Sequence, residues 1–193
     1  ELTRKELKKF AGYPLGAVKG RLNQTAAAMG RIQLEHYPGR IAEIQRALNR
    51  FWDLLEGTPG IAPHRPPGGD GSTMGGWYNP VGLYDPEPLG GLSAERFMEA
   101  IRAEGVTSTA QGVNQPMHLH PVLNEADIFR DRTPTRIAFS DRDVRQEEGS
   151  LPVAESIQKR TIPVPYFKHD DPALIAQHAA AYRKVALQAE ALI

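Results

Sequence analysis

The chain contains no cysteine, which excludes disulfide bonds, thiolate metal sites and a cysteine nucleophile. It also lacks an excess of either charge, because 23 lysines and arginines balance 23 aspartates and glutamates. A nucleic-acid surface needs a basic excess to displace counterions, so we expect no nucleic-acid partner. No apolar run approaches the roughly 18 residues that a membrane helix needs, so we expect no membrane partner. A cytoplasmic location fits the absence of cysteine.

Aromatic residues are also scarce, at 7% of the chain, and an initiator methionine is missing. The hydrophobic content of 40% still permits a normal core, built mainly from aliphatic side chains and alanine. The length of 193 residues suits one domain or one and a half. The charged start contains no apolar signal-peptide core. A missing methionine suggests a trimmed, processed or partial chain.

The spacing of apolar residues predicts a long helical region near the start. Apolar side chains recur three and four residues apart over 22–36 and again over 39–56. Pro38 separates the two stretches, so we expect two helices or one kinked helix. Residues 57–76 are rich in proline and glycine and predict a loop.

Helix caps mark three further helices. Ser93 is a suitable N-cap for a helix over 94–104, with Phe97, Met98 and Ile101 on its buried face. Pro152 opens a short helix that ends near Lys159. Asp171 followed by Pro172 begins a final helix, whose expected core residues are Ile175, Ala179, Tyr182 and Ala186.

Three strands are expected over 77–85, 106–113 and 162–167. Residues 114–149 look irregular, with a possible short helix near 124–129. The predicted fold class is therefore α/β, with a long N-terminal helix and a small three-stranded sheet flanked by helices. The expected division is 1–56 for a linking and interface region, 57–76 for a loop, and 77–193 for a small C-terminal domain.

Four segments together carry a family resemblance. They are Arg21-Leu-Asn-Gln-Thr-Ala-Ala-Ala-Met-Gly-Arg-Ile-Gln-Leu34, Ser93-Ala-Glu-Arg-Phe-Met-Glu-Ala-Ile-Arg-Ala-Glu-Gly-Val106, Gln115-Pro-Met-His-Leu-His-Pro121 and residues 151–185. In this order they resemble the DegT/DnrJ/EryC1/StrS family of sugar aminotransferases, which depend on pyridoxal 5'-phosphate (PLP). The resemblance spans about residues 15–192.

The resemblance implies a C-terminal small domain and linking helix of the PLP-dependent transferase fold type I. The family's large domain would precede residue 1, in cis or as a separate chain, and would hold the cofactor and its Schiff-base lysine. The chain has seven lysines, and none lies in the sequence context that the family uses for this residue. We therefore expect the chain to be inactive alone.

The resemblance also implies a homodimer in which the start of the linking helix reaches the PLP phosphate of the partner. Lys19 stands at the position of the family's phosphate-binding asparagine, and Arg21 matches the family's arginine. Lysine serves a phosphate as a point charge and arginine serves it bidentately. A shift of the alignment by one or two residues would promote Asn23 instead. Without the family, solvated charges before a helix are the simpler interpretation.

His118 and His120 are candidates for lining the substrate site, since the family has a Pro-Leu-His loop there. In an extended segment the two side chains would project to one face. A rival hypothesis is a metal pair with Glu125 or Asp127 as third ligand. The plainest alternative is one surface histidine and one packed histidine.

Other notable residues suggest structural roles. Trp77 and Tyr78 are expected to fill the core, because large aromatics after a glycine-rich loop usually anchor it. The run Lys168-His169-Asp170-Asp171 predicts a solvent-facing strand end followed by an aspartate helix cap.

Two functions remain open at this point. The first is the C-terminal part of an aminotransferase that transfers an amino group from an amino-acid donor to a keto-sugar or keto-cyclitol. The second is a stand-alone remnant without catalysis that serves as a binding or regulatory module. The second hypothesis expects an apolar face on residues 22–56 that has lost its original cover.

Overall fold

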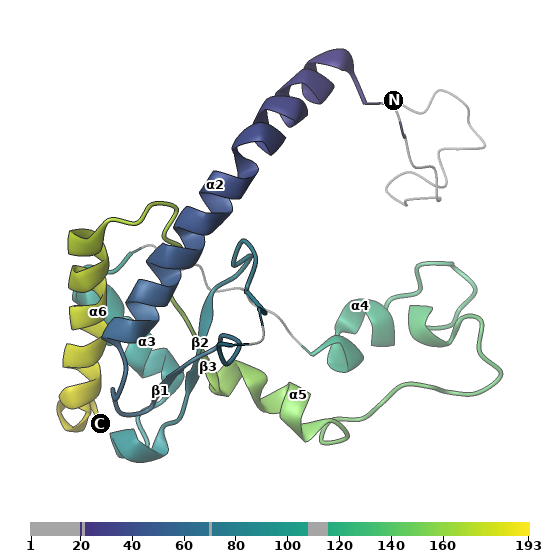
Figure 1. The fold of residues 1–193 in the computed structure, drawn as a ribbon. Coiled ribbons are helices and arrows are strands. Elements are labelled where there is room, and N and C mark those ends of the chain that lie inside the picture. The colour runs from purple at the N-terminus through teal and green to yellow at the C-terminus, as the bar shows by residue number, and fades with distance from the viewer. Residues whose placement is uncertain (1–19, 21, 70, 108–115) are drawn as a thin grey trace. The chain divides into compact units, whose positions relative to one another are not determined.

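The structure, a computed structural model, describes residues 20, 22–69, 71–107 and 116–193. Contacts divide the chain into two compact units. The first unit contains residues 1–33 and 115–150, and the second contains residues 34–114 and 151–193. The second unit holds the three-stranded sheet and the helices that cover it (Figure 1). None of the helices in the described ranges is both long and apolar enough to span a membrane.

A single long helix, α2 (Gln24–Leu54), occupies the region where two helices or one kinked helix were predicted (Figure 1). The alternative of two separate helices is wrong, because the helix continues through Pro38. Proline there removes the N–H that would bond the carbonyl of Leu34. Residues 34–40 are exposed, so water can replace the missing donor.

The two halves of α2 differ sharply in burial. Residues 27–40 are all exposed, whereas the C-terminal half buries five side chains, Ile44, Ala47, Leu48, Phe51 and Trp52. Only the second half therefore contributes to the core of its unit.

The sheet consists of β1 (Ile61–Pro63), β2 (Val81–Tyr84) and β3 (Thr161–Pro163). The strands are antiparallel in the order β1-β2-β3. The register places Ala62 opposite Leu83, and Gly82 opposite Ile162. A small three-stranded sheet was expected, but its membership differs from the prediction.

Two of the three predicted strands overlap strands in the structure. β2 lies within the predicted strand 77–85, and β3 overlaps the predicted strand 162–167 but ends at Pro163. Proline has no N–H to donate to a ladder, and Pro163 and Pro165 account for the early end.

The third strand was misplaced. β1 lies inside the region predicted as a loop. Its three residues follow Gly60 and end with Pro63, and a segment this short shows no alternation of apolar and polar residues that could predict a strand. Residues 106 and 107 are not in a strand, and the rest of the predicted strand 106–113 lies outside the described residues.

The helix α3 (Ala94–Ala103) confirms the prediction for its segment. The Ser93 hydroxyl accepts from the N–H of Arg96 at 3.2 Å, and the expected apolar face is buried. At its end, Gly105 has a φ of 92°, and the N–H of Val106 donates to the carbonyl of Ile101 at 3.3 Å. This is the hydrogen-bond pattern of a glycine-terminated helix.

The helix α6 (Pro172–Leu187) also begins as predicted. The Asp171 carboxylate accepts from the N–H groups of Ala173 and Leu174 at 3.0 and 3.1 Å. All four expected core residues of this helix are buried, and Tyr182 donates its hydroxyl to the Pro163 carbonyl at 2.8 Å. The helix is thereby joined to the end of β3.

Shorter elements complete the described chain. They are α4 (Pro121–Asn124), α5 (Pro152–Ser156) and the 3-10 turns Glu87–Leu89, Met117–Leu119, Thr135–Ile137, Ile157–Lys159 and Ala189–Leu192. The predicted short helix from Pro152 to Lys159 is confirmed as α5 followed by a 3-10 turn. The one expected near 124–129 lies earlier, at α4.

Phe51 stands at the centre of the core of the second unit. Its ring lies 5.3 Å from Trp52, 5.5 Å from Phe167 and 5.4 Å from Tyr182, measured between ring centroids. These rings join α2, α6 and the segment after β3. Trp77 is buried as expected, but Tyr78 is fully exposed, so its predicted core role is wrong. The chain turns toward the solvent after Trp77, so the Trp77 side chain enters the core and the Tyr78 side chain does not.

A polar cluster joins α2 to the chain before α6. Arg50 donates to both carboxylate oxygens of Asp170 at 2.8 and 3.1 Å, and Arg46 lies 3.6 Å away. The hydrogen bond from Arg50 holds the pKa of the Asp170 carboxyl below its ordinary value. Asp170 was predicted to face solvent, but it is half-buried in this cluster.

We expect Asp170→Asn to destabilise the chain at pH 7 and to have much less effect near pH 2. A carboxylate whose pKa is lowered by folding stabilises the fold above its unfolded pKa, and this contribution is lost as the pH falls through the folded pKa. Urea unfolding of both proteins at several pH values measures the difference. An equal loss of stability at every pH would contradict the assignment.

Candidate functional site

The start of α2 is capped by Asn23. The N–H of Ala26 donates to the side-chain Oδ1 of Asn23 at 2.7 Å, and the N–H of Ala27 donates to its carbonyl at 3.0 Å. Lys19 and Arg21, the other two residues predicted to bind the phosphate, lie outside the described residues. The cap leaves the amide nitrogen of Asn23 available, and the end of the helix favours an anion.

We expect Asn23→Ala to speed amide hydrogen exchange at Ala26 about fivefold, because losing a cap costs about 1 kcal/mol. Asn23→Asp is the matched control, since aspartate caps a helix about as well as asparagine. Exchange followed by NMR on the full chain compares the two variants. Identical exchange in the alanine variant and the parent would show that the cap contributes nothing.

An uncovered apolar surface runs along the N-terminal half of α2. Leu22 just before it and Met29, Leu34 and Tyr37 on it are 72%, 62%, 71% and 55% exposed. Apolar side chains of this size, close together on one helix, usually have a covering partner. These four side chains, which the unit boundary at residues 33 and 34 divides between the two units, are therefore left exposed by the described residues.

The two candidate histidines lie in one turn. His118 lies in the 3-10 turn Met117–Leu119. His120 is the residue that caps the end of this turn, and it directly precedes α4. The His118 carbonyl accepts from the Asn124 amide at 2.5 Å and from Arg136 at 3.2 Å. The His118 side chain is buried, and that of His120 is half-buried.

The expectation that both histidines project to one face assumed an extended segment, whereas His118 lies in a 3-10 turn and His120 is the extended residue that ends it. The regular alternation behind that expectation is therefore absent. Whether either side chain meets a substrate stays a prediction.

The rival metal hypothesis finds no cluster to support it. Across the described ranges, no group of three or more histidine, aspartate or glutamate side chains is placed to hold a metal ion. Asp127, one of the proposed third ligands, accepts instead from the N–H groups of Asp131 and Arg132 at 3.1 and 2.9 Å. Its carboxylate therefore supports a loop in which Arg130 and Arg132 have φ values of 57° and 71°.

The lysines in the described part of the chain do not fit the role of a cofactor-binding amine. Lys159 and Lys168 are exposed, and Lys184 donates to both carboxylate oxygens of Glu104 at 2.8 Å. An imine-forming lysine is activated by burial or a neighbouring cation. None of these three described lysines is buried or has a neighbouring cation shown to activate it.

A groove between α5 and the sheet was not predicted from the sequence. It has a volume of about 710 Å³ and includes Leu83, Val153, Ile157 and Arg160 in its lining. The first three of these side chains are exposed apolar groups, and Val153 is 68% exposed. The only available signal was Leu83, which alternates with buried Gly82 and Tyr84 along β2. The sheet therefore has a second apolar surface, opposite its helices.

Comparison with protein-family models identifies the family of the chain. The model of the DegT/DnrJ/EryC1/StrS aminotransferase family matches residues 2–177, which are most of the 193 residues. No curated protein matches the chain.

Proposed function

The chain belongs to the DegT/DnrJ/EryC1/StrS aminotransferase family, and from this premise we propose that it forms the C-terminal part of a PLP-dependent aminotransferase. The enzyme transfers an amino group from an amino-acid donor to a keto-sugar or keto-cyclitol. A large domain, in cis or in trans, holds the cofactor. The present chain closes over that domain and contributes to a homodimer in the cytoplasm.

The fold supports this role. A long helix leads into a small antiparallel sheet, α3 packs against β3, and α6 packs against α3. This order of elements suits the small domain of the type I fold, in which a linking helix joins the two domains. The buried core of the second unit includes side chains of α2, α3 and α6, as expected for a linking helix packed on a small domain.

The uncovered half of α2 is the observation that carries the proposal. The C-terminal half of α2 buries five side chains, whereas residues 27–40 are all exposed. Exposed apolar side chains such as Met29 and Leu34 are costly to leave in water. We assign this surface to the large domain and the dimer partner.

We assign the PLP phosphate of the partner to Lys19, Arg21 and Asn23. Asn23 uses its oxygen to cap α2, and its amide nitrogen can donate to a phosphate at the same time. Arg21 supplies a planar pair of donors and Lys19 a point charge. Together with the positive end of the helix, these groups would neutralise and orient the phosphate.

We assign the substrate to the turn that holds His118 and His120. His120 is the better placed of the two, since its side chain is only half-buried. The bonds from Asn124 and Arg136 to the His118 carbonyl hold the turn in position. His118 then acts by supporting the turn, and His120 by contacting a hydroxyl of the substrate.

Isolation of the native protein tests the proposal. Intact mass should show either a longer chain that contains these residues or a second chain that bears the Schiff-base lysine. The preparation should transfer an amino group from glutamate or glutamine to a keto-sugar. A native chain of this length, without a partner and without transfer activity, would favour the alternative of a non-catalytic binding module.

A further inference from the structure

The helix α2 has a weak point at Pro38 and Gly39, which are neighbours inside it. Proline has no N–H to donate to the Leu34 carbonyl, and its ring crowds that same carbonyl, so the hydrogen-bond ladder is interrupted there. Glycine is the next least favourable residue in a helix interior, because it loses the most backbone freedom on folding. Sharp bends in helices occur mainly at proline and at small residues of this kind.

Burial does not reinforce this weak point. Residues 27–40 are all exposed, so the helix reaches Pro38 without a packed face. No atom lies within 4 Å of the position that an added Cβ would take at Gly39. The boundary between the two compact units also falls in this part of α2, between residues 33 and 34. The space and the lack of packing at Pro38 and Gly39 therefore both permit a bend.

Packing of α2 begins just beyond the weak point. Ile41 is the first residue after Gly39 that is not exposed. A Cβ added to Gly76 would lie 3.2 Å from Ile41 Cδ1, so the loop before β2 lies against the helix at this point. The following turns bury five side chains in the core of the second unit. The helix is thereby fixed from Ile41 to its end.

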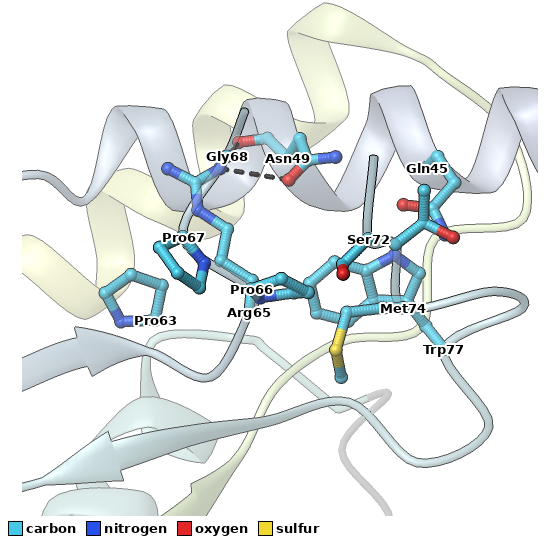
Figure 2. Close-up of a pocket in the computed structure, with 11 residues that line it drawn as sticks. Gln45, Asn49, Pro63, Arg65, Pro66, Pro67, Gly68, Ser72, Met74 and Trp77 are labelled. Carbon is cyan, nitrogen blue, oxygen red and sulfur yellow. Dashed lines mark hydrogen bonds between the residues drawn. The ribbon is translucent and has the colours of Figure 1, made fainter. Parts of the chain in front are cut away.

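Polar contacts hold the same half of α2. The Gln45 side chain donates to the Gly75 carbonyl. The Asn49 side-chain oxygen accepts from Arg65 at 3.0 Å, the bond that Figure 2 draws as a dashed line. Both Gly75 and Arg65 belong to the connection between β1 and β2, so these bonds tie α2 to the sheet. Packing and hydrogen bonds thus act together on residues 41–54, which we call the packed half.

The part of α2 before the weak point, residues 24–37, is stabilised locally. We call it the arm. Asn23 caps its start, and residues 26–28 are all alanine, the best helix former. These features favour an arm that stays helical, so that motion concentrates at Pro38 and Gly39.

We propose that Pro38 and Gly39 form a hinge at which the arm bends against the packed half. The arm follows the residues assigned to the PLP phosphate, whereas the packed half belongs to the core of the small domain. The hinge lets the small domain close while the phosphate contacts stay in place. This use of the hinge rests on the proposed function, but the hinge itself requires neither cofactor nor partner.

Pulsed electron double resonance on the full chain tests the hinge. The chain has no cysteine, so Ala28→Cys and Arg46→Cys introduce the only two sites for spin labels. Both positions are exposed and lie on either side of the hinge. They are five helical turns apart on one face, which is about 27 Å along a straight helix. We expect a broad distribution of distances in the labelled parent.

Pro38→Ala combined with Gly39→Ala should narrow this distribution about twofold and centre it near 27 Å, because it restores the hydrogen bond to the Leu34 carbonyl and inserts two good helix formers. Gly30→Ala is the matched control. Gly30 also lies between the labels, is exposed, and has no atom within 4 Å of an added Cβ. It should leave the width unchanged.

Equal widths in the parent and the double variant overturn the hinge. Equal narrowing by Gly30→Ala also overturns it, because the whole arm would then be fraying. If the double variant fails to fold, Pro38→Ala alone replaces it, with narrowing expected and an unchanged width overturning the proposal. Because the measurement uses the chain without PLP, a rigid helix would leave the proposed function standing, and a failure of the proposed function would leave the hinge standing.

Discussion

Phe51→Ala is expected to lower the free energy of unfolding by about 3–5 kcal/mol, the usual cost of emptying a fully buried aromatic site. Phe51 is 0% exposed and contacts three other aromatic rings, which belong to α2, α6 and the segment after β3. These neighbours cannot collapse into the space without moving a helix. Urea unfolding followed by circular dichroism gives the value.

Leu54→Ala is the matched control on the same helix. Leu54 is 40% exposed, and its loss should cost less than about 1 kcal/mol. Comparable losses in the two variants would show that the aromatic cluster is not the folding centre of the second unit.

Gly60→Ala is expected to destabilise the chain by about 2–4 kcal/mol. Gly60 has a φ of 70°, and an added Cβ would lie 2.6 Å from the Asp85 carbonyl oxygen and 2.6 Å from Leu89 Cδ1. The carbonyl belongs to the backbone and cannot rotate away. The cost combines the left-handed backbone, about 1–2 kcal/mol, with overpacking of about 1–3 kcal/mol.

Gly57→Ala separates these two terms. Gly57 has nearly the same φ, 73°, but no atom lies within 4 Å of the position of its added Cβ. It should lose only the backbone term, about 1–2 kcal/mol. Equal destabilisation of the two variants, measured by urea unfolding, would contradict the close approach at Gly60.

The elements that the sequence predicted well are those with local signals. The serine cap of α3, the Asp-Pro start of α6 and the apolar spacing of both helices each lie within one short segment. Such signals depend only on residues that are close in the sequence, so they can be read without knowing the tertiary structure. The family could also be identified from the sequence, because the resemblance depends on short motifs in a fixed order.

The features that escaped prediction depend on distant contacts. β1 has three residues and is a strand only because β2 lies beside it. Arg50 and Asp170 are 120 residues apart, so no local pattern links them. Pro38 left two helices or one kinked helix open, and the structure has one continuous helix, because proline is tolerated where the freed carbonyl meets water.

The candidate site shows the same limit. The motif containing His118 and His120 was readable, but the turn that holds it is supported by hydrogen bonds from Asn124 and Arg136 to the His118 carbonyl. Arg65 lies in a stretch that the sequence showed only as a proline- and glycine-rich loop. Its hydrogen bonds to Asn49 and Asp53, one helical turn apart on α2, could not be read from that stretch alone.

The central claim is that this chain completes a cofactor pocket but carries no cofactor-binding lysine of its own. The most direct measurement incubates the folded chain with one equivalent of PLP, reduces any imine with borohydride, and determines the intact mass and the modified residue. We predict no stoichiometric modification of a single lysine beyond the scattered labelling seen after the chain is unfolded. One pyridoxyl group on one lysine, present in the folded chain and lost on unfolding, would contradict the account.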